Sequence, residues 1–276
     1  RRQRQMCIRD RNYSYYSDIL WCSLPLVGMS CYFYGLRPVL LFLAALLTAY
    51  LCDCALAPLH GTGYQSHEPS SECFAALIVL MMPASISYPI VIAAVIVAVL
   101  VKEAFGGEGH YPFHPAAVGV VVAGISWPKN VFSYPVPGTQ LPLFGEVNTT
   151  LVEGMNATLR DGGLPSASTM NLLTGNVSAG IGTGAALVIL ACGLVLWTQK
   201  DVHIGASASF LITCGLIAFF FPRQVGLADS TLFSSLMPRL QGVRDELHTG
   251  AMLFCAVFLL NEPYTCAHHR LSLIHI

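Results

Sequence analysis

The sequence predicts an all-α polytopic membrane protein, a helix bundle in which some helices are broken or re-entrant. Of its 276 residues 54% are hydrophobic and only 11% are charged, whereas a soluble domain carries about 25% charged residues. The mean hydropathy of +0.61 agrees with a membrane class. Long apolar runs recur without the alternation of strands, which indicates helices in a lipid bilayer. The net charge of −1 provides no basic surface, so no nucleic-acid partner is expected.

The two ends of the chain are expected to be non-native. Residues 1–11 form an arginine-rich run, and residues 271–276 read LSLIHI. Both strings resemble translated adapter sequence, and they are set aside as a tag would be. We therefore expect the chain to be a truncated fragment of a longer protein.

The first two spans are predicted at 19–34 and 39–57, with a Gly-Leu-Arg-Pro turn between them. Asp53 lies inside the second run, where it serves ion passage or sits near the helix end. No metal site is expected, because the ten cysteines form no CxxC pair and most of them lie inside apolar runs.

The next apolar run, 73–101, is uncharged and has 29 residues, more than the ~20 residues of one straight span. Pro83 and Pro89 flank the sequence ASISY, so two helices with a tight break are predicted. A Gly- and Pro-rich link at 102–115 then leads to 116–127, which is apolar but short. This pattern indicates a discontinuous or re-entrant element of the kind that lines sites in transporters.

A long non-membrane segment follows at 128–183, and segments of that length are usually functional. Further spans are predicted at 184–199, 206–221 and 249–267. If the N-terminus is cytoplasmic, parity places 128–183 on the outer side and the links that hold Lys102 and Lys200 inside.

The sequence LPSASTMNLLTGN, residues 164–176, is rich in hydroxyl side chains and lies beside a span. From the residues alone, a solvated loop with helix-capping residues explains it as well as a functional site does.

Three motifs in order resemble the RnfD/NqrB family of membrane subunits of ion-pumping oxidoreductases. They are KEAFGGEGHYPFHPAAVG at 102–119, SASTMNLLTGN at 166–176 and GAMLFCAVFLLNEPYT at 250–265. In the first and third motifs two positions differ from the family pattern, since His114 replaces Asn and Glu262 replaces Asp. The resemblance implies a urea-transporter-like fold of two inverted repeats. Residues 17–127 would be the first membrane repeat, 128–183 the outward loop, and 184–267 the start of the second repeat.

The resemblance also implies a cofactor on the second motif. In the family a Ser/Thr-Gly-Ala-Thr signature carries covalent FMN, esterified to the threonine by a flavin transferase. The matching positions are Ser166, Ala167, Ser168 and Thr169, with Ala167 where the family has Gly and Ser168 where it has Ala. Thr169 is therefore the predicted phosphoryl-threonine, with Ser166 and Ser168 as neighbouring hydroxyls. Riboflavin is allowed as a second flavin.

The link of the first motif is predicted to line an ion or cofactor path. Glycines permit unusual backbone, and broken backbone at membrane depth persists only where protein, cofactor or water satisfies it. The alternative is an ordinary interfacial turn. The residues concerned are Glu103, Gly106, Gly107, Glu108 and Gly109.

The function implied is that of a flavin-bearing, multi-pass subunit of an Rnf-type complex in the bacterial inner membrane. It would couple electron transfer from ferredoxin to NAD with translocation of Na⁺ or H⁺. Its partners would be the other subunits of the complex, the flavin transferase and the lipid bilayer. The alternative function is a channel or secondary transporter without a redox cofactor.

Overall fold

The computed structural model describes residues 2–56, 69–107, 110–145, 147, 149–163, 167–223, 236–249 and 251–265. For residues 2–13 and Thr249 the structure describes the backbone but not the side chains. Ser166, Glu108 and Gly109 lie outside the described residues, as do the C-terminal residues 271–276.

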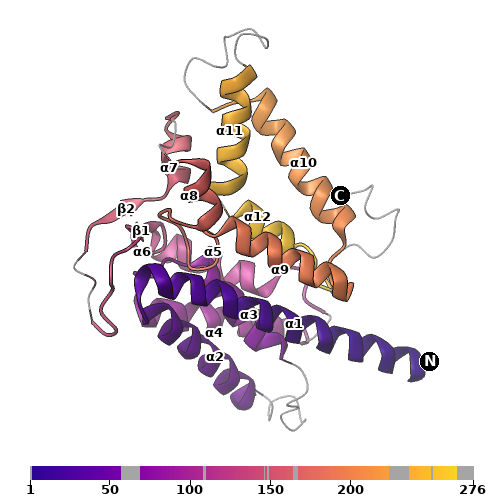
Figure 1. Ribbon diagram of the computed structural model, residues 1–276. Coiled ribbons are helices and arrows are strands. Elements are labelled where there is room, and N and C mark those ends of the chain that lie inside the picture. The colour runs from indigo at the N-terminus through magenta and orange to yellow at the C-terminus, as the bar shows by residue number, and fades with distance from the viewer. Residues whose placement is uncertain are drawn as a thin grey trace.

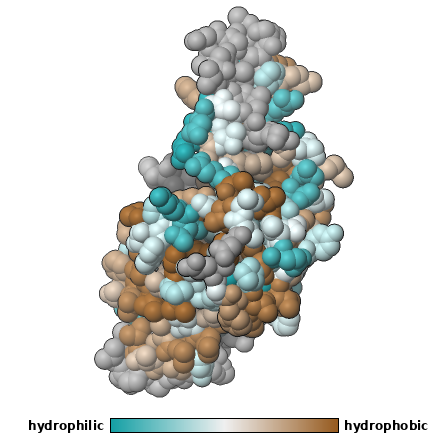
Figure 2. All heavy atoms as spheres, turned by 90° about the vertical axis from the view of Figure 1, so that its left-hand side faces the viewer, coloured by the Kyte–Doolittle hydropathy of each residue, from teal (hydrophilic) through white to brown (hydrophobic). Residues whose placement is uncertain are grey.

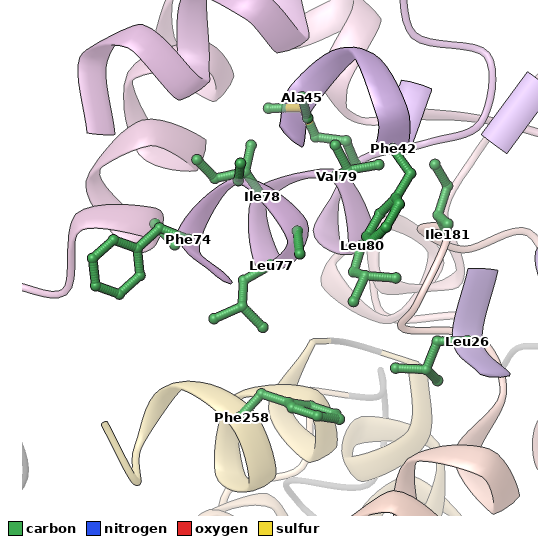
Figure 3. Packing of buried hydrophobic residues seen from close by; sticks show 14 of the residues in the cluster. Leu26, Phe42, Ala45, Phe74, Leu77, Ile78, Val79, Leu80, Ile181 and Phe258 are labelled. Atoms are coloured by element: carbon green, nitrogen blue, oxygen red, sulfur yellow. The ribbon is translucent and has the colours of Figure 1, made fainter. Parts of the chain in front are cut away.

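Four helices pack around α3, a 12-residue helix whose side chains are almost all buried. Its neighbours are α1, α2, α4 and α5, each of which contacts it. Leu77, Ile78 and Leu80 of α3 point into the core that Figure 3 shows, where Phe258 approaches from the C-terminal part of the chain. The helices are α1 (Arg2–Tyr34), α2 (Arg37–Leu56), α3 (Ser70–Met81), α4 (Tyr88–Ala104) and α5 (Pro115–Ser126).

The break predicted between Pro83 and Pro89 is confirmed. α3 ends at Met81, the backbone turns extended at Met82, and α4 begins at Tyr88 with proline in its first turn. Proline cannot donate an intrahelical hydrogen bond, so the helix cannot continue through this segment.

The backbone groups freed by this break are satisfied from far along the chain. The N–H of Ile181 donates to the carbonyl of Met82 at 2.9 Å, and the N–H of Gly182 donates to that of Leu80 at 2.7 Å. The approach requires glycine, because a Cβ on Gly182 would lie 2.7 Å from the Cβ of Leu80. Buried Arg37 donates to the carbonyl of Ile86 at 3.1 Å. Such pairing is what broken backbone needs away from water.

The segment 128–183 contains more regular structure than a loop. It holds α6 (Pro128–Val131), an antiparallel pair of strands, α7 (Met155–Arg160) and α8 (Thr169–Thr174). The strands β1 (Ser133–Pro135) and β2 (Leu151–Glu153) pair with Tyr134 opposite Val152. The all-α prediction missed this pair, because three-residue strands are too short to show a periodic pattern.

The C-terminal helices are α9 (Ala186–Gln199), α10 (Ile204–Phe220), α11 (Leu236–Thr249), α12 (Met252–Phe254) and the π-helix η2 (Cys255–Leu259). α9 packs against α1 and η2, whereas α10 and α11 pair with each other and project from the bundle (Figure 1). The span predicted at 249–267 is not one helix, because η2 ends at Leu259 and turns follow. The first helix also differs from prediction, since α1 begins at Arg2 rather than near residue 19.

In the part of the chain described, α2 is the one helix of at least 18 residues that is apolar enough to cross a membrane. α4 has 17 residues, and the apolar helices α3, α5, α9 and α10 are no longer than that. Figure 2 shows hydrophobic side chains concentrated on the lower part of one face and more hydrophilic ones above. Every residue of α10 retains solvent-exposed surface, so its apolar side chains need lipid or protein around them.

Candidate functional site

The predicted attachment residue, Thr169, is the first residue of α8 and is exposed. The capping role belongs to its neighbour, because the Ser168 hydroxyl accepts the N–H of Asn171 at 3.4 Å. Ser168 has the extended backbone of an N-cap residue, with φ −71° and ψ 155°. The capping interpretation of the hydroxyl-rich run therefore accounts for Ser168 but leaves the Thr169 hydroxyl for another role.

A cation from a distant helix contacts this hydroxyl. Nη1 of Arg244, on α11, donates to Oγ1 of Thr169 at 2.9 Å. No sequence pattern indicates this contact, because 75 residues separate the two positions. It brings a guanidinium group, the side chain best shaped for phosphate, to the hydroxyl predicted to carry one.

A cavity of about 360 Å³ lies where the segment 128–183 meets the broken helices. Its size falls within the range of small-molecule sites. Arg160 of α7 and Arg223 line it, together with Tyr134. Burial raises the pKa of the Tyr134 phenol, so this hydroxyl stays protonated and is able to donate. The further lining residues include Met81, Val120, Asn156, Gly180 and Thr183.

The link predicted to line a path follows α4. Gly106 and Gly107 have φ values of +104° and +83°, which residues with a side chain rarely adopt. Glu103 is half-buried, and its carboxylate lies 3.7 Å from Nζ of Lys102. Lys102 was predicted to lie in the link, but it belongs to the last turn of α4 and is buried.

Lys102 joins the link to α2 and α3. Its Nζ donates to Oγ of Ser71 at 2.9 Å, and Ser71 donates to Oδ1 of Asp53 at 2.9 Å. Asp53 lies in the last turn of α2, near the helix end. The structure thus brings together Asp53, Lys102 and Glu103.

Another carboxylate, that of Glu262, is buried near the same link. Glu262 accepts the hydroxyls of Tyr16 at 3.0 Å and Tyr111 at 2.7 Å. Its other oxygen accepts the N–H groups of Tyr264 and Thr265 at 3.1 and 2.7 Å. Four donors thus surround the carboxylate, two on each oxygen. Sequence reasoning noted Glu262 as a departure from the family pattern but missed both tyrosines.

His114, the other departure, begins α5 as its N-cap residue. Its ring packs edge-on against Phe74 with centroids 5.3 Å apart. Both ring nitrogens are buried and have no hydrogen-bond partner among the described residues.

The cavity and the acidic groups lie at opposite ends of α3. Ser71 contacts the acidic end, and Met81 lines the cavity. With a rise of 1.5 Å per residue, the ten steps from Ser71 to Met81 span about 15 Å.

Known proteins share the pattern of this chain along nearly its whole length. The model of the NQR2, RnfD, RnfE family matches residues 9–274. The chain belongs to this family. It is 27% identical to a Klebsiella pneumoniae (strain 342) protein that is named as a subunit of the ion-translocating oxidoreductase complex, over 90% of this chain and 77% of that protein. Proteins of the same name from Actinobacillus pleuropneumoniae serotype 5b (strain L20) and Escherichia coli (strain ATCC 8739) are each 26% identical, over 90% of this chain and 78% and 77% of theirs.

Family membership confirms the resemblance on which the flavin prediction depends. The residues at the predicted site fit a phosphate ester, since an exposed threonine hydroxyl already contacts a guanidinium group. The roles of Thr169, Ser168 and the link residues remain predictions.

Proposed function

We propose that the chain is the flavin-bearing subunit of an ion-translocating oxidoreductase complex of the Rnf type, in a bacterial inner membrane. The relatives that are named as subunits of such a complex support this function. FMN would be esterified to Thr169, and the other subunits and a flavin transferase would be its partners. The inverted repeats implied by the family belong to the same proposal.

The observation that carries the flavin proposal is the division of roles between two adjacent hydroxyls. Ser168 caps α8, while the Thr169 hydroxyl is exposed and contacts Arg244. A hydroxyl that is accessible and not needed for the cap is one that a transferase is able to reach. When bound, the flavin would supply one- and two-electron redox chemistry.

The attachment step is a phosphoryl-group transfer. Oγ1 of Thr169 would attack the flavin phosphate of a pyrophosphate-linked flavin donor. The Oγ1–P bond forms, the P–O bond of the pyrophosphate breaks, the hydroxyl proton passes to solvent, and the second phosphate leaves with its nucleoside. This chain contributes the acceptor hydroxyl and the fixed position of α8.

Ion translocation would use the acidic groups at the other end of α3. Ionisable groups within membrane segments commonly mark ion pathways. Asp53 and Glu103 lie on the two sides of Lys102, next to the positive-φ turn at Gly106 and Gly107. We therefore keep the link as part of the proposed path, with Glu108 and Gly109 outside the described residues.

The experiment that tests the flavin is in-gel fluorescence. The protein is coexpressed with a flavin transferase, and membranes are separated by denaturing electrophoresis and viewed under ultraviolet light. A fluorescent band is expected for wild type and none for Thr169→Val. Thr174→Val is the matched control, because Thr174 is on the same helix and its hydroxyl donates to the Met170 carbonyl at 2.8 Å. A band that persists in Thr169→Val at wild-type strength contradicts the assignment.

The second candidate function is a channel or secondary transporter without a flavin. The helix break after α3 and the buried carboxylate of Glu262 favour it, because both features also suit transport alone. The same gel separates the two functions when paired with an ion-flux assay. Flux in vesicles without flavin or electron donor would support the transporter.

A further inference from the structure

Arg244 directly contacts the proposed attachment hydroxyl of Thr169. The role inferred for Arg244 rests on the proposed function and adds a residue to it. The residue lies on α11, outside the motif that contains Thr169. Its Nη1 donates to Oγ1 of Thr169 at 2.9 Å. This bond joins a guanidinium to a neutral hydroxyl, and it is weaker than a bond between two ions.

The guanidinium is held in place from its other edge. Nε and Nη2 of Arg244 lie 2.8 and 2.6 Å from Oδ1 of Asp245, whose side chain is only 2% exposed. The Arg244 carbonyl lies 2.8 Å from Nδ1 of His248, one turn later on the helix. Since Asp245 is buried and fixes two nitrogens of the fork, the third, Nη1, has a defined direction toward Thr169.

A phosphate ester on Thr169 places charge within reach of Nη1. A phosphodiester carries one negative charge, shared between two non-bridging oxygens. These oxygens are bonded to the same phosphorus atom as the ester oxygen, so they lie next to it. Nη1 is therefore able to donate to a non-bridging oxygen in place of Oγ1 without movement of either helix. The new bond joins two ions and is stronger than the one it replaces.

We propose that Arg244 is the phosphate-holding residue of the flavin site. Its Nη1 binds a non-bridging oxygen of the ester at Thr169 and stabilises the phosphate both during attachment and afterwards. The ligand class is the phosphodiester of a flavin nucleotide, so a flavin without phosphate gains nothing from this residue. Arg244 thereby ties the flavin to α11 as well as to α8.

The test measures how fast covalent flavin forms. Purified flavin-free protein is incubated with the transferase and a pyrophosphate-linked flavin donor, and in-gel fluorescence is read at short times. A hydrogen bond to a charged group is worth enough for Arg244→Gln to lower the initial rate by about tenfold. Arg244→Lys keeps the charge and should stay within about threefold of wild type.

The control is Lys129→Gln. Lys129 is an exposed cation on α6 and does not line the cavity. The substitution removes one positive charge without touching Thr169, so a rate within about twofold of wild type is expected.

A second readout is the fluorescence anisotropy of flavin attached to completion. A phosphate that Arg244 no longer holds lets the flavin rotate more freely, so anisotropy should fall in Arg244→Gln and not in Lys129→Gln. Equal losses in Arg244→Gln and Arg244→Lys would show a structural effect and overturn the inference. So would an Arg244→Gln variant that matches Lys129→Gln in both measurements. A wild-type protein that accepts no flavin would instead overturn the proposed function, and this inference with it.

Discussion

Glu262 should stabilise the fold as an ionised carboxylate, and removing the Tyr111 hydroxyl should reveal this. Tyr111→Phe deletes the donor that lies 2.7 Å from the carboxylate and keeps the ring. The ring packs edge-on against Phe74 and Tyr264, with centroids 5.9 and 6.0 Å away, so little packing is lost. The Tyr111 hydroxyl also lies 3.2 Å from that of Tyr16, which itself donates to Glu262. The cost of the substitution is then mainly that of the shorter bond, from Tyr111 to the carboxylate.

The magnitude depends on the charge of the acceptor. A hydrogen bond to a charged group contributes about 1.5–3 kcal/mol, and one between neutral groups about 0.5–1.5 kcal/mol. Tyr111→Phe should therefore cost about 2 kcal/mol in the wild-type background and about 1 kcal/mol in the Glu262→Gln background. The coupling free energy between the two sites is expected to be about 1 kcal/mol.

The assay is the free energy of unfolding, from denaturant titration in detergent micelles, for wild type, the two single variants and the double variant. Tyr88→Phe serves as the control in the same cycle, because its hydroxyl donates to the carbonyl of Leu143 and not to Glu262. Its coupling to Glu262→Gln should be close to zero. An equal cost for Tyr111→Phe in both backgrounds would refute the reasoning, because it would mean that Glu262 is neutral.

Three further predictions concern backbone and topology. Gly182→Ala should lower the melting temperature in detergent clearly more than the control Gly205→Ala. The new Cβ at position 182 would lie 2.7 Å from Leu80, whereas no atom lies within 4 Å of a Cβ at position 205. Equal melting temperatures of the two variants would contradict the close packing. Gly107→Val should stop ion-coupled electron transfer in reconstituted complex while leaving in-gel flavin fluorescence unchanged, since φ +83° excludes valine; normal pumping by this variant would make the link an ordinary turn. With native cysteines removed, an impermeant thiol reagent should label a cysteine at position 138 in intact cells but not one at position 199, and the reverse pattern would invert the orientation.

Local signals in the sequence predicted the features that depend on local chemistry. Proline fixes its own backbone wherever it occurs, so Pro83 and Pro89 were enough to place the break between α3 and α4. An apolar run of the right length was likewise enough to place α2. The motif around Thr169 could be recognised because its residues are consecutive.

The partners of these features could not be predicted, because they come from distant parts of the chain. The sequence predicted that Arg37 is part of a turn, yet its side chain is buried and donates to the carbonyl of Ile86. The tyrosines on Glu262 and the arginine on Thr169 lie in segments with no sequence relation to the groups they contact. Their positions follow from tertiary packing, which no periodicity or spacing along the chain encodes.

The hydrogen bonds that Ile181 and Gly182 donate to the end of α3 make α8 and the broken helix one mechanical unit. The chain that leaves α8 reaches Met82 within a few residues, and Ile181 is itself packed into the apolar core. A displacement of α8 toward or away from the bundle would have to open these backbone bonds, and an unsatisfied backbone group away from water costs several kcal/mol. The segment that bears Thr169 is therefore connected to the break between α3 and α4 by backbone hydrogen bonds. A movement of α8 would change the backbone pairing at that break.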